Sequence, residues 1–92
     1  MQTSQSKISK KELFTNALGK VIKRLRDKSK LSSREIAFSM SLSKTTILHA
    51  EKGILDPQLS TFFKITEAFN LTPVDLLTMV NKELPQNFTF ED

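Results

Sequence analysis

Residues 32–53, SSREIAFSMSLSKTTILHAEKG, decide the fold of this chain. Ser32 and Glu35 form the S-x-x-E pattern of a helix-capping box, and two apolar residues follow directly. In such a box the first side chain accepts a hydrogen bond from the backbone N–H three residues on, and the acidic side chain accepts one in return. The pattern predicts a helix that begins at Ser33 and ends near Met40.

A second short helix is predicted after a very short connection. Ser41-Leu42 is too short for anything but a tight turn, and Ser43 is the next N-cap residue, so we expect a helix over 44–52. Gly53 stands where a left-handed residue ends a helix. Two short helices joined in this way can present the second one to the major groove of DNA.

Three further helices are predicted around this pair. Apolar residues spaced by three and four positions predict a long helix over 12–29, with basic residues on its other faces. An apolar-rich segment over 59–69 predicts another helix, after a loop that contains an Asp-Pro turn signal. Thr72 as N-cap and Pro73 at the first helical position predict the last helix, which ends near Lys82.

The expected organisation is one all-α, compact five-helix domain over residues 12–82. A flexible basic arm is expected over 1–11 and a weakly structured tail over 83–92. The 92 residues suffice for one small core, and the absence of cysteine excludes disulfides and thiolate metal sites. A single histidine argues against a histidine-based zinc site, so no metal or cofactor is expected. The sequence has neither an apolar run of about 20 residues nor a secretory signal, which predicts a cytoplasmic protein.

The net charge of +4 conceals an uneven distribution along the chain. Residues 1–30 carry a balance of +7, residues 31–53 carry +1, and residues 54–92 carry −4. Such asymmetry suggests an anionic partner for the basic half. Charge alone is equally compatible with a basic helix face that is merely solvated.

Taken in order along the chain, several motifs resemble the Cro/phage-repressor (XRE-type) helix-turn-helix family. The resemblance covers about residues 18–77. Its motifs are Leu18-Gly19 with Ile22, Leu25 and Arg26; Leu31-Ser32 with Glu35-Ile36-Ala37; Ser43 to Ile47 with Glu51 and Gly53; and Pro57, Leu59, Ile65, Phe69, Leu71 and Leu76-Leu77. The resemblance implies the compact lambda-repressor-like fold and a sequence-specific regulator of transcription that binds double-stranded DNA.

Three residues depart from the family's pattern. Lys30 and Ser41 stand where the family often has glycine, and Ser33 replaces a frequent glutamine. A non-glycine residue held at positive φ in such a turn costs about 1 kcal/mol. These departures affect turn strain and one DNA contact rather than the fold.

The helix over 44–52 is expected to read DNA in the major groove, with Ile47 and Ala50 facing inward. The resemblance and the side-chain chemistry together give the predicted base contacts: Lys44, Thr45, Leu48 and His49. Lysine can donate to guanine, threonine and leucine can touch a thymine methyl, and histidine can donate or accept at a base edge. The alternatives are a plain phosphate contact for the lysine, core packing or a dimer contact for the leucine, and a solvated surface histidine.

Phosphate contacts are predicted from helix N-termini, hydroxyls and cations. The predicted set is Ser33, Arg34, Ser41, Ser43, Thr46 and Lys64, with Ser60 and Thr61 as weaker members. Lysines of the N-terminal arm, at positions 7, 10 and 11, lie along DNA or belong to a disordered tail. The resemblance also pairs Arg26 with Glu51 in a semi-buried ion pair that ties the first helix to the third, which is a structural role rather than a catalytic one.

A homodimer on a near-palindromic operator is expected, because one such unit makes few base contacts. The predicted dimer contacts are Leu76, Leu77, Met79, Val80 and Phe88, with Phe90 as an extension and a short strand at the alternation of these phenylalanines. The same apolar residues can instead close the monomer's own core. No membrane and no small-molecule effector are expected as partners.

The alternative function is a helix-turn-helix module that binds a protein, such as a toxin or a polymerase subunit, with weak or non-specific DNA binding. The polar face of the helix over 44–52 argues against it. An enzyme is not expected, since the chain has no cysteine nucleophile and no glycine-rich phosphate loop. Phage repressors, restriction–modification controllers and antitoxins all remain open as roles.

Overall fold

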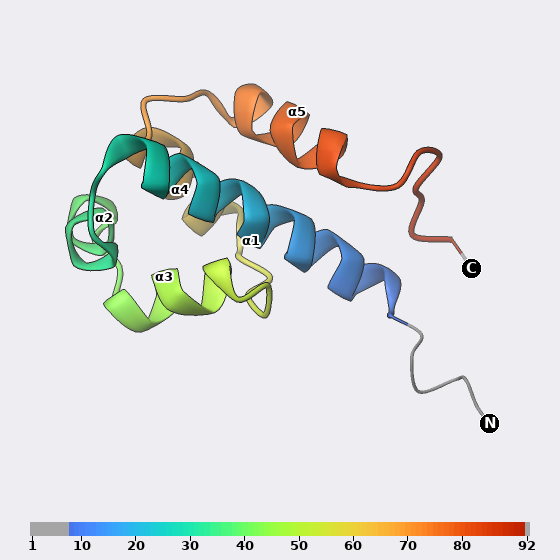
Figure 1. Cartoon of the computed structure of the whole chain (residues 1–92), viewed down its shortest axis with the longest axis horizontal. Helices are drawn as coiled ribbons and strands as arrows, with labels where there is room; N and C mark the ends of the chain where they lie inside the picture. Colours follow the sequence, from blue (N-terminus) through green and yellow to red (C-terminus); the bar gives the residue numbers. More distant parts are fainter. Residues whose placement is uncertain (1–7, 92) are drawn as a thin grey trace.

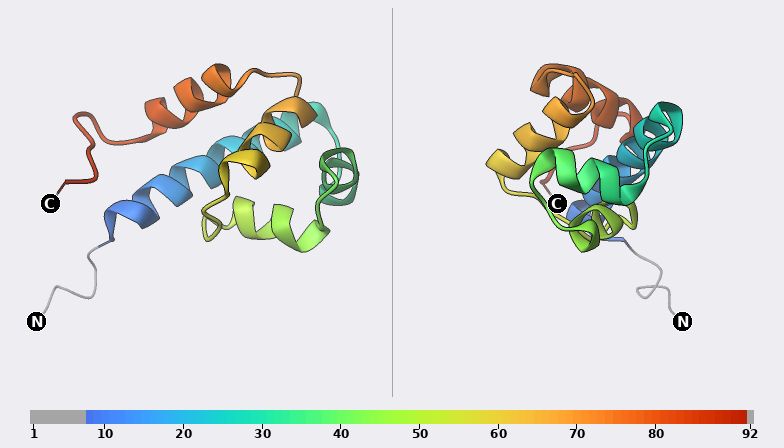
Figure 2. Two further views of the ribbon diagram at one scale, coloured as in Figure 1. Left: turned by 180° about the vertical axis from the view of Figure 1, so that it is seen from behind. Right: turned by 90° about the vertical axis from the view of Figure 1, so that its left-hand side faces the viewer.

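A computed structural model describes residues 8–91 of the chain. The helices are α1 (Lys10–Ser29), α2 (Ser33–Met40), α3 (Lys44–Glu51), α4 (Leu59–Ala68) and α5 (Pro73–Glu83). Figure 1 shows α1 through the middle of the molecule, with α3 on one side of it and α5 on the other. Helix α4 lies behind α1 in Figure 1 and in front of it in the left view of Figure 2, which is seen from behind, and α2 lies across the C-terminal end of α1. The all-α five-helix fold expected from the sequence is confirmed, and the described residues contain no strand at Phe88 or Phe90.

Helix α1 begins earlier than the sequence pattern predicts. Ser9 is its N-cap: the Ser9 hydroxyl accepts from the Glu12 N–H at 3.1 Å, and the Glu12 carboxylate accepts from the Ser9 N–H at 3.0 Å. Lys10 and Lys11 therefore belong to the first helical turn and not to a flexible arm, which corrects that prediction. Lys7, the third basic residue of the expected arm, lies outside the described residues.

Helices α2 and α3 begin where their capping residues predict. The Ser32 hydroxyl accepts from the Glu35 N–H at 3.1 Å, and the Glu35 carboxylate accepts from the Ser32 N–H at 2.8 Å. Ser43 caps α3 in the same sense, although without a reciprocal carboxylate. Gly53 follows α3 with φ of 79°, the left-handed conformation that the glycine was expected to supply.

Helix α5 begins with the predicted Thr72 cap and Pro73. The Thr72 N–H donates to the Asp75 carboxylate at 3.0 Å, and the Thr72 hydroxyl accepts from the Asp75 N–H at 3.1 Å. The bond from the Thr72 backbone N–H, followed by the Thr72 side chain, lowers the pKa of Asp75 because hydrogen bonding to the carboxylate favours its charged form. The helix is thereby fixed at its N-terminus while its apolar face packs on α1.

The core lies between α1 and the other four helices. It consists of Ala17, Leu18, Val21, Ile22, Ile36, Ala37, Met40, Ile47, Ala50, Phe62, Ile65, Leu76 and Val80. At Gly19, α1 approaches the end of α3 so closely that an added Cβ would lie 2.4 Å from the Ala50 carbonyl oxygen and 3.0 Å from the Gly53 nitrogen. Both neighbours are backbone atoms, so only a residue without a Cβ fits at this crossing.

The C-terminal tail folds back along the first turns of α1 rather than extending away. The Lys10 ammonium donates to the Thr89 and Glu91 carbonyl oxygens, at 2.6 Å each. The Phe90 ring lies 6.0 Å from the Phe14 ring and 5.1 Å from the Phe88 ring, centroid to centroid. The two ends of the described chain are therefore joined by aromatic and hydrogen-bonded contacts.

Replacing Gly19 by alanine should lower the free energy of unfolding by about 2–3 kcal/mol or more, because the added methyl group overpacks against backbone that cannot rotate away. Urea unfolding followed by circular dichroism measures this. Lys20→Ala is the matched control on the exposed face of the same helix, and its effect should stay within about 0.5 kcal/mol. Equal stability of the two variants would contradict the close packing of α1 on α3.

Candidate nucleic-acid interface

The two faces of α3 differ sharply in polarity. Ile47 and Ala50 are buried against the core, as expected. The side chains of Lys44, Thr45 and His49 are exposed, which places three of the four predicted base-contact residues on the solvent side of one helix. The fourth, Leu48, is half-buried and lies at the border between the two faces.

Hydroxyl groups fix the N-terminus of α3. The Ser43 hydroxyl accepts from the Thr46 N–H at 3.1 Å, and the two hydroxyl oxygens lie 2.9 Å apart. Both side chains are thus held beside Lys44 at the start of the helix. Backbone N–H groups at a helix N-terminus attract anions, and the hydroxyls can add donors to them.

A cationic groove adjoins this end of α3. It has a volume of about 460 Å³ and is lined by Arg26, Ser32, Ser33, Arg34 and Lys44. Among residues 8–91, neither Arg34 nor Lys44 has a carboxylate within salt-bridge distance. The groove therefore combines the N-terminus of α2 with uncompensated positive charge. The sequence predicts Ser33, Arg34 and Lys44 for this surface but not Arg26 and Ser32. The packing of α1 brings Arg26 there, whereas Ser32 is the N-cap residue directly before Ser33.

Arg26 and Glu51 form the ion pair expected from the resemblance. The Arg26 Nη2 atom donates to Glu51 Oε1 at 2.9 Å, and Arg26 Nε donates to the other carboxylate oxygen. The side chains are 19% and 8% exposed, respectively. The hydrogen bonds to Glu51 raise the pKa of Arg26 further, although burial opposes this. The third guanidinium nitrogen, Nη1, donates weakly to the Leu31 carbonyl oxygen at 3.4 Å, so the pair links α1, α3 and the connection that leads into α2.

Other predicted contact residues lie at the edges of this surface. Ser41 ends α2 in the left-handed conformation, with φ of 57°. Lys64 and Ser60 are exposed on α4, outside the groove, and Thr61 is half-buried there. The Phe38 side chain on α2 is 87% exposed, a feature that the sequence pattern does not single out.

Burial corrects the predicted dimer contacts. Leu76 and Val80 are fully buried in the monomer's own core, so they cannot touch a partner without unfolding. Leu77 is 48% exposed and Met79 is half-buried, which leaves these two on α5. Phe88 is half-buried beneath the Lys10 ammonium, which lies 5.6 Å from the ring centroid. The spacing of apolar residues in the sequence could not decide which side of α5 faces α1.

Neither a membrane helix nor a metal-ligand cluster is found within residues 8–91. Each helix there is too short or too polar to cross a bilayer. No three His, Cys, Asp or Glu side chains of this segment are grouped so that they could hold a metal ion. The candidate site is the polar surface formed by α2 and α3.

An exposed polar helix, held from behind and set beside a cationic groove, defines a helix-turn-helix protein of the DNA-binding class that regulates transcription. The chain belongs to the helix-turn-helix family, whose model matches residues 22–76. The resemblance inferred from the sequence is thus confirmed. No curated protein matches the chain significantly.

Solved structures share the fold. The clp gene regulator ClgR from Corynebacterium glutamicum superposes with a TM-score of 0.70 at 19% identity, over 75% of this chain and 73% of ClgR. A second crystal structure of ClgR gives a TM-score of 0.72 at 18% identity, over 78% of this chain and 92% of the ClgR chain. A mutant of the restriction-modification controller protein C.Esp1396I gives 0.70 at 20% identity, over 76% of this chain and 89% of the controller. At these identities the likeness concerns the fold alone.

Replacing Glu51 by glutamine should lower the free energy of unfolding by about 2–4 kcal/mol. Breaking a fully buried pair costs about 3–5 kcal/mol, and Arg26 retains some access to water. Glu67→Gln, an exposed position on α4, is the control and should change stability by less than about 0.5 kcal/mol. If chemical denaturation gives the same midpoint and slope for Glu51→Gln and the wild type, the pair does not hold α3 in place.

Proposed function

We propose that the protein is a sequence-specific regulator of transcription whose helix α3 reads double-stranded DNA in the major groove. One observation carries this proposal: Lys44, Thr45 and His49 are all exposed on α3. The opposite side of the helix is packed into the core through Ile47 and Ala50. A helix of this kind fits the major groove, where each base pair presents a distinct set of donors and acceptors.

The proposed base contacts divide by chemistry. The Lys44 ammonium donates to guanine or to a phosphate, and the Thr45 side chain offers both a hydroxyl and a methyl group. His49 donates to or accepts from a base edge. Leu48, at the border of the face, contributes an apolar contact to a thymine methyl.

Phosphate contacts are proposed along the groove and the ends of α2 and α3. Ser33 and Arg34 in the groove, with Ser43 and Thr46 at the α3 cap, supply hydroxyl, guanidinium and backbone donors. Ser41 at the turn and Lys64 on α4 complete the proposed set. Several neutralised phosphates require that affinity fall steeply with salt, because bound counterions are released.

The proposed assembly is a homodimer on a near-palindromic operator, with half-sites about one helical turn apart. Exposed apolar side chains of α4 and α5 support it: Leu59, Val74 and Leu77 are all about half or more exposed. A hollow of about 280 Å³ adjoins them and includes Leu77, Leu59 and Phe14 in its lining. The proposed contacts are Leu77 and Met79, with Phe88 at the edge.

In fluorescence anisotropy near physiological salt, the protein should prefer the duplex upstream of its own coding sequence over a scrambled duplex by about 10³ or more. His49→Ala should reduce this preference by about tenfold, because one base contact is lost, and should leave binding to the scrambled duplex unchanged.

Weak and equal binding to both duplexes would contradict self-regulation, and selection from a random duplex pool would then decide between another operator and a protein partner. Equal losses by His49→Ala on both duplexes would remove His49 from base readout.

Leu77→Asp should shift the protein from dimer to monomer in sedimentation equilibrium at micromolar concentration, because a charge would be buried in an apolar contact. Thr78→Asp places the same charge on the next, exposed residue of α5 and is the control. A wild type that sediments as a monomer without DNA, or an equal effect of both variants, would contradict the proposed contact.

A further inference from the structure

The turn between α1 and α2 holds a lysine in a conformation that suits glycine. Lys30 has φ of 65° and ψ of 20°, and its N–H donates to the Arg26 carbonyl oxygen at 3.0 Å and to that of Asp27 at 3.3 Å. A side chain with a Cβ is strained in this left-handed region, where glycine is not. The fold alone would therefore favour glycine at this position.

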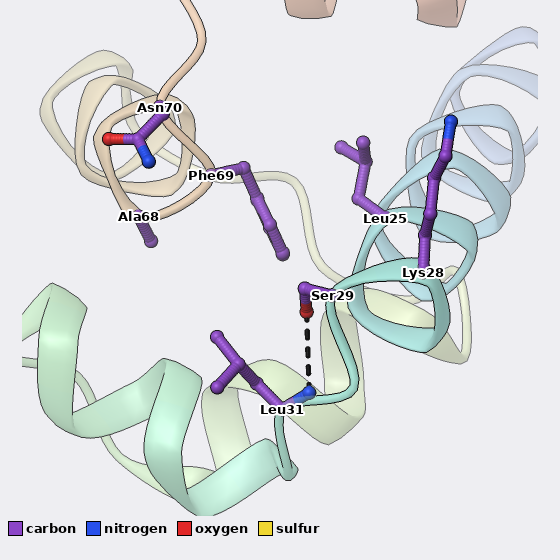
Figure 3. A pocket seen from close by; sticks show the side chains of 7 residues that line it. All are labelled: Leu25, Lys28, Ser29, Leu31, Ala68, Phe69 and Asn70. Atoms are coloured by element: carbon purple, nitrogen blue, oxygen red, sulfur yellow. Dashed lines mark hydrogen bonds between the residues drawn. The ribbon is translucent and has the colours of Figure 1, made fainter.

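Apolar contacts and a hydroxyl group hold the turn between α1 and α2 in place. Leu25, Leu31 and Phe69 converge around a hollow of about 320 Å³ between the C-terminal ends of α1 and α4 (Figure 3). The Ser29 hydroxyl accepts from the Leu31 N–H at 3.3 Å. Lys30 is exposed and does not line this hollow. The strained conformation is thus imposed by its neighbours, while its own side chain is left to the solvent.

The cationic groove begins two residues after Lys30, at Ser32. Lys30 and Ser32 are two residues apart, so their Cα atoms lie within about 7 Å of each other. A lysine side chain can span that distance. The carboxylates of this region are already engaged: Asp27 with Lys23 at 3.8 Å, and Glu35 with the Ser32 N–H at 2.8 Å. Glu51 is likewise engaged, with Arg26. Lys30 therefore adds an exposed positive charge next to a groove that already holds cations, and none of these carboxylates is paired with it.

We propose that Lys30 is a phosphate-binding residue: its ammonium group binds the DNA backbone where that backbone enters the groove at the N-terminus of α2. The inference rests on the proposed DNA-binding function and adds a contact that the predicted set did not contain. A charge-assisted contact between the Lys30 ammonium and a phosphate would offset the cost of the left-handed backbone that the fold imposes on this residue.

The test measures stability and DNA binding on the same variant, Lys30→Gly, with a duplex of random sequence. The melting temperature should rise by a few degrees, because the strain is relieved. Affinity at 0.1 M salt should fall by about five- to tenfold, and the slope of log K against log salt should become less steep by about one. Lys30→Arg should keep the affinity and the slope of the wild type. Lys82 is a remote exposed lysine on α5, and Lys82→Ala should change neither quantity.

Unchanged affinity and slope in Lys30→Gly would overturn the inference, as would a loss of equal size in Lys30→Arg. Lys30→Asn, which tolerates the left-handed region but carries no charge, repeats the test if the glycine variant alters the turn. Lys44→Ala separates this inference from the proposed function. Loss of binding in Lys44→Ala alone rejects the role of Lys30, whereas no loss in either variant rejects the DNA interface itself.

Discussion

The candidate nucleic-acid interface depends on the contact between α1 and α3. Helix α3 has eight residues, about 12 Å of helix, and a helix this short does not persist in water without tertiary contacts. Two features of α1 fix it: the missing Cβ of Gly19, which lets the Ala50 backbone approach, and the guanidinium of Arg26, which holds Glu51. The first sets the distance between the helices and the second sets the rotation of α3 about its own axis. These two contacts therefore determine where the exposed side chains of α3 lie.

The molecule separates a polar face from an apolar one. The outer side of α3 and the start of α2 carry hydroxyls and uncompensated cations, whereas α4 and α5 expose Leu59, Val74 and Leu77. These two surfaces share no residue, so a partner on one does not directly cover the residues of the other. A protein that binds DNA as a dimer needs such a division, since the two contacts must form together.

Local signals in the sequence predict most of the fold. The starts of α2, α3 and α5 follow from capping residues, because a cap bonds within three positions of itself. The same S-x-x-E pattern at Ser9 lies within a polar segment, so the apolar periodicity alone begins α1 two residues late. Long-range features leave no such local signal: the tail is held by a lysine 79 positions away, and the groove joins three helices. On α5, periodicity marks Leu76, Leu77 and Val80 as one apolar set, and only packing shows which two are buried.

The turns at both ends of α2 show how stability and function oppose each other in this domain. Lys30 and Ser41 are non-glycine residues at positive φ, and each flanks the helix that would cross the DNA backbone. Left-handed strain of this kind costs about 1 kcal/mol per residue, which is a considerable part of the stability of a small domain. Asn70 occupies the same region after α4, but asparagine tolerates it. The two residues that tolerate it least thus border the proposed interface, which is where departures from local preference indicate function.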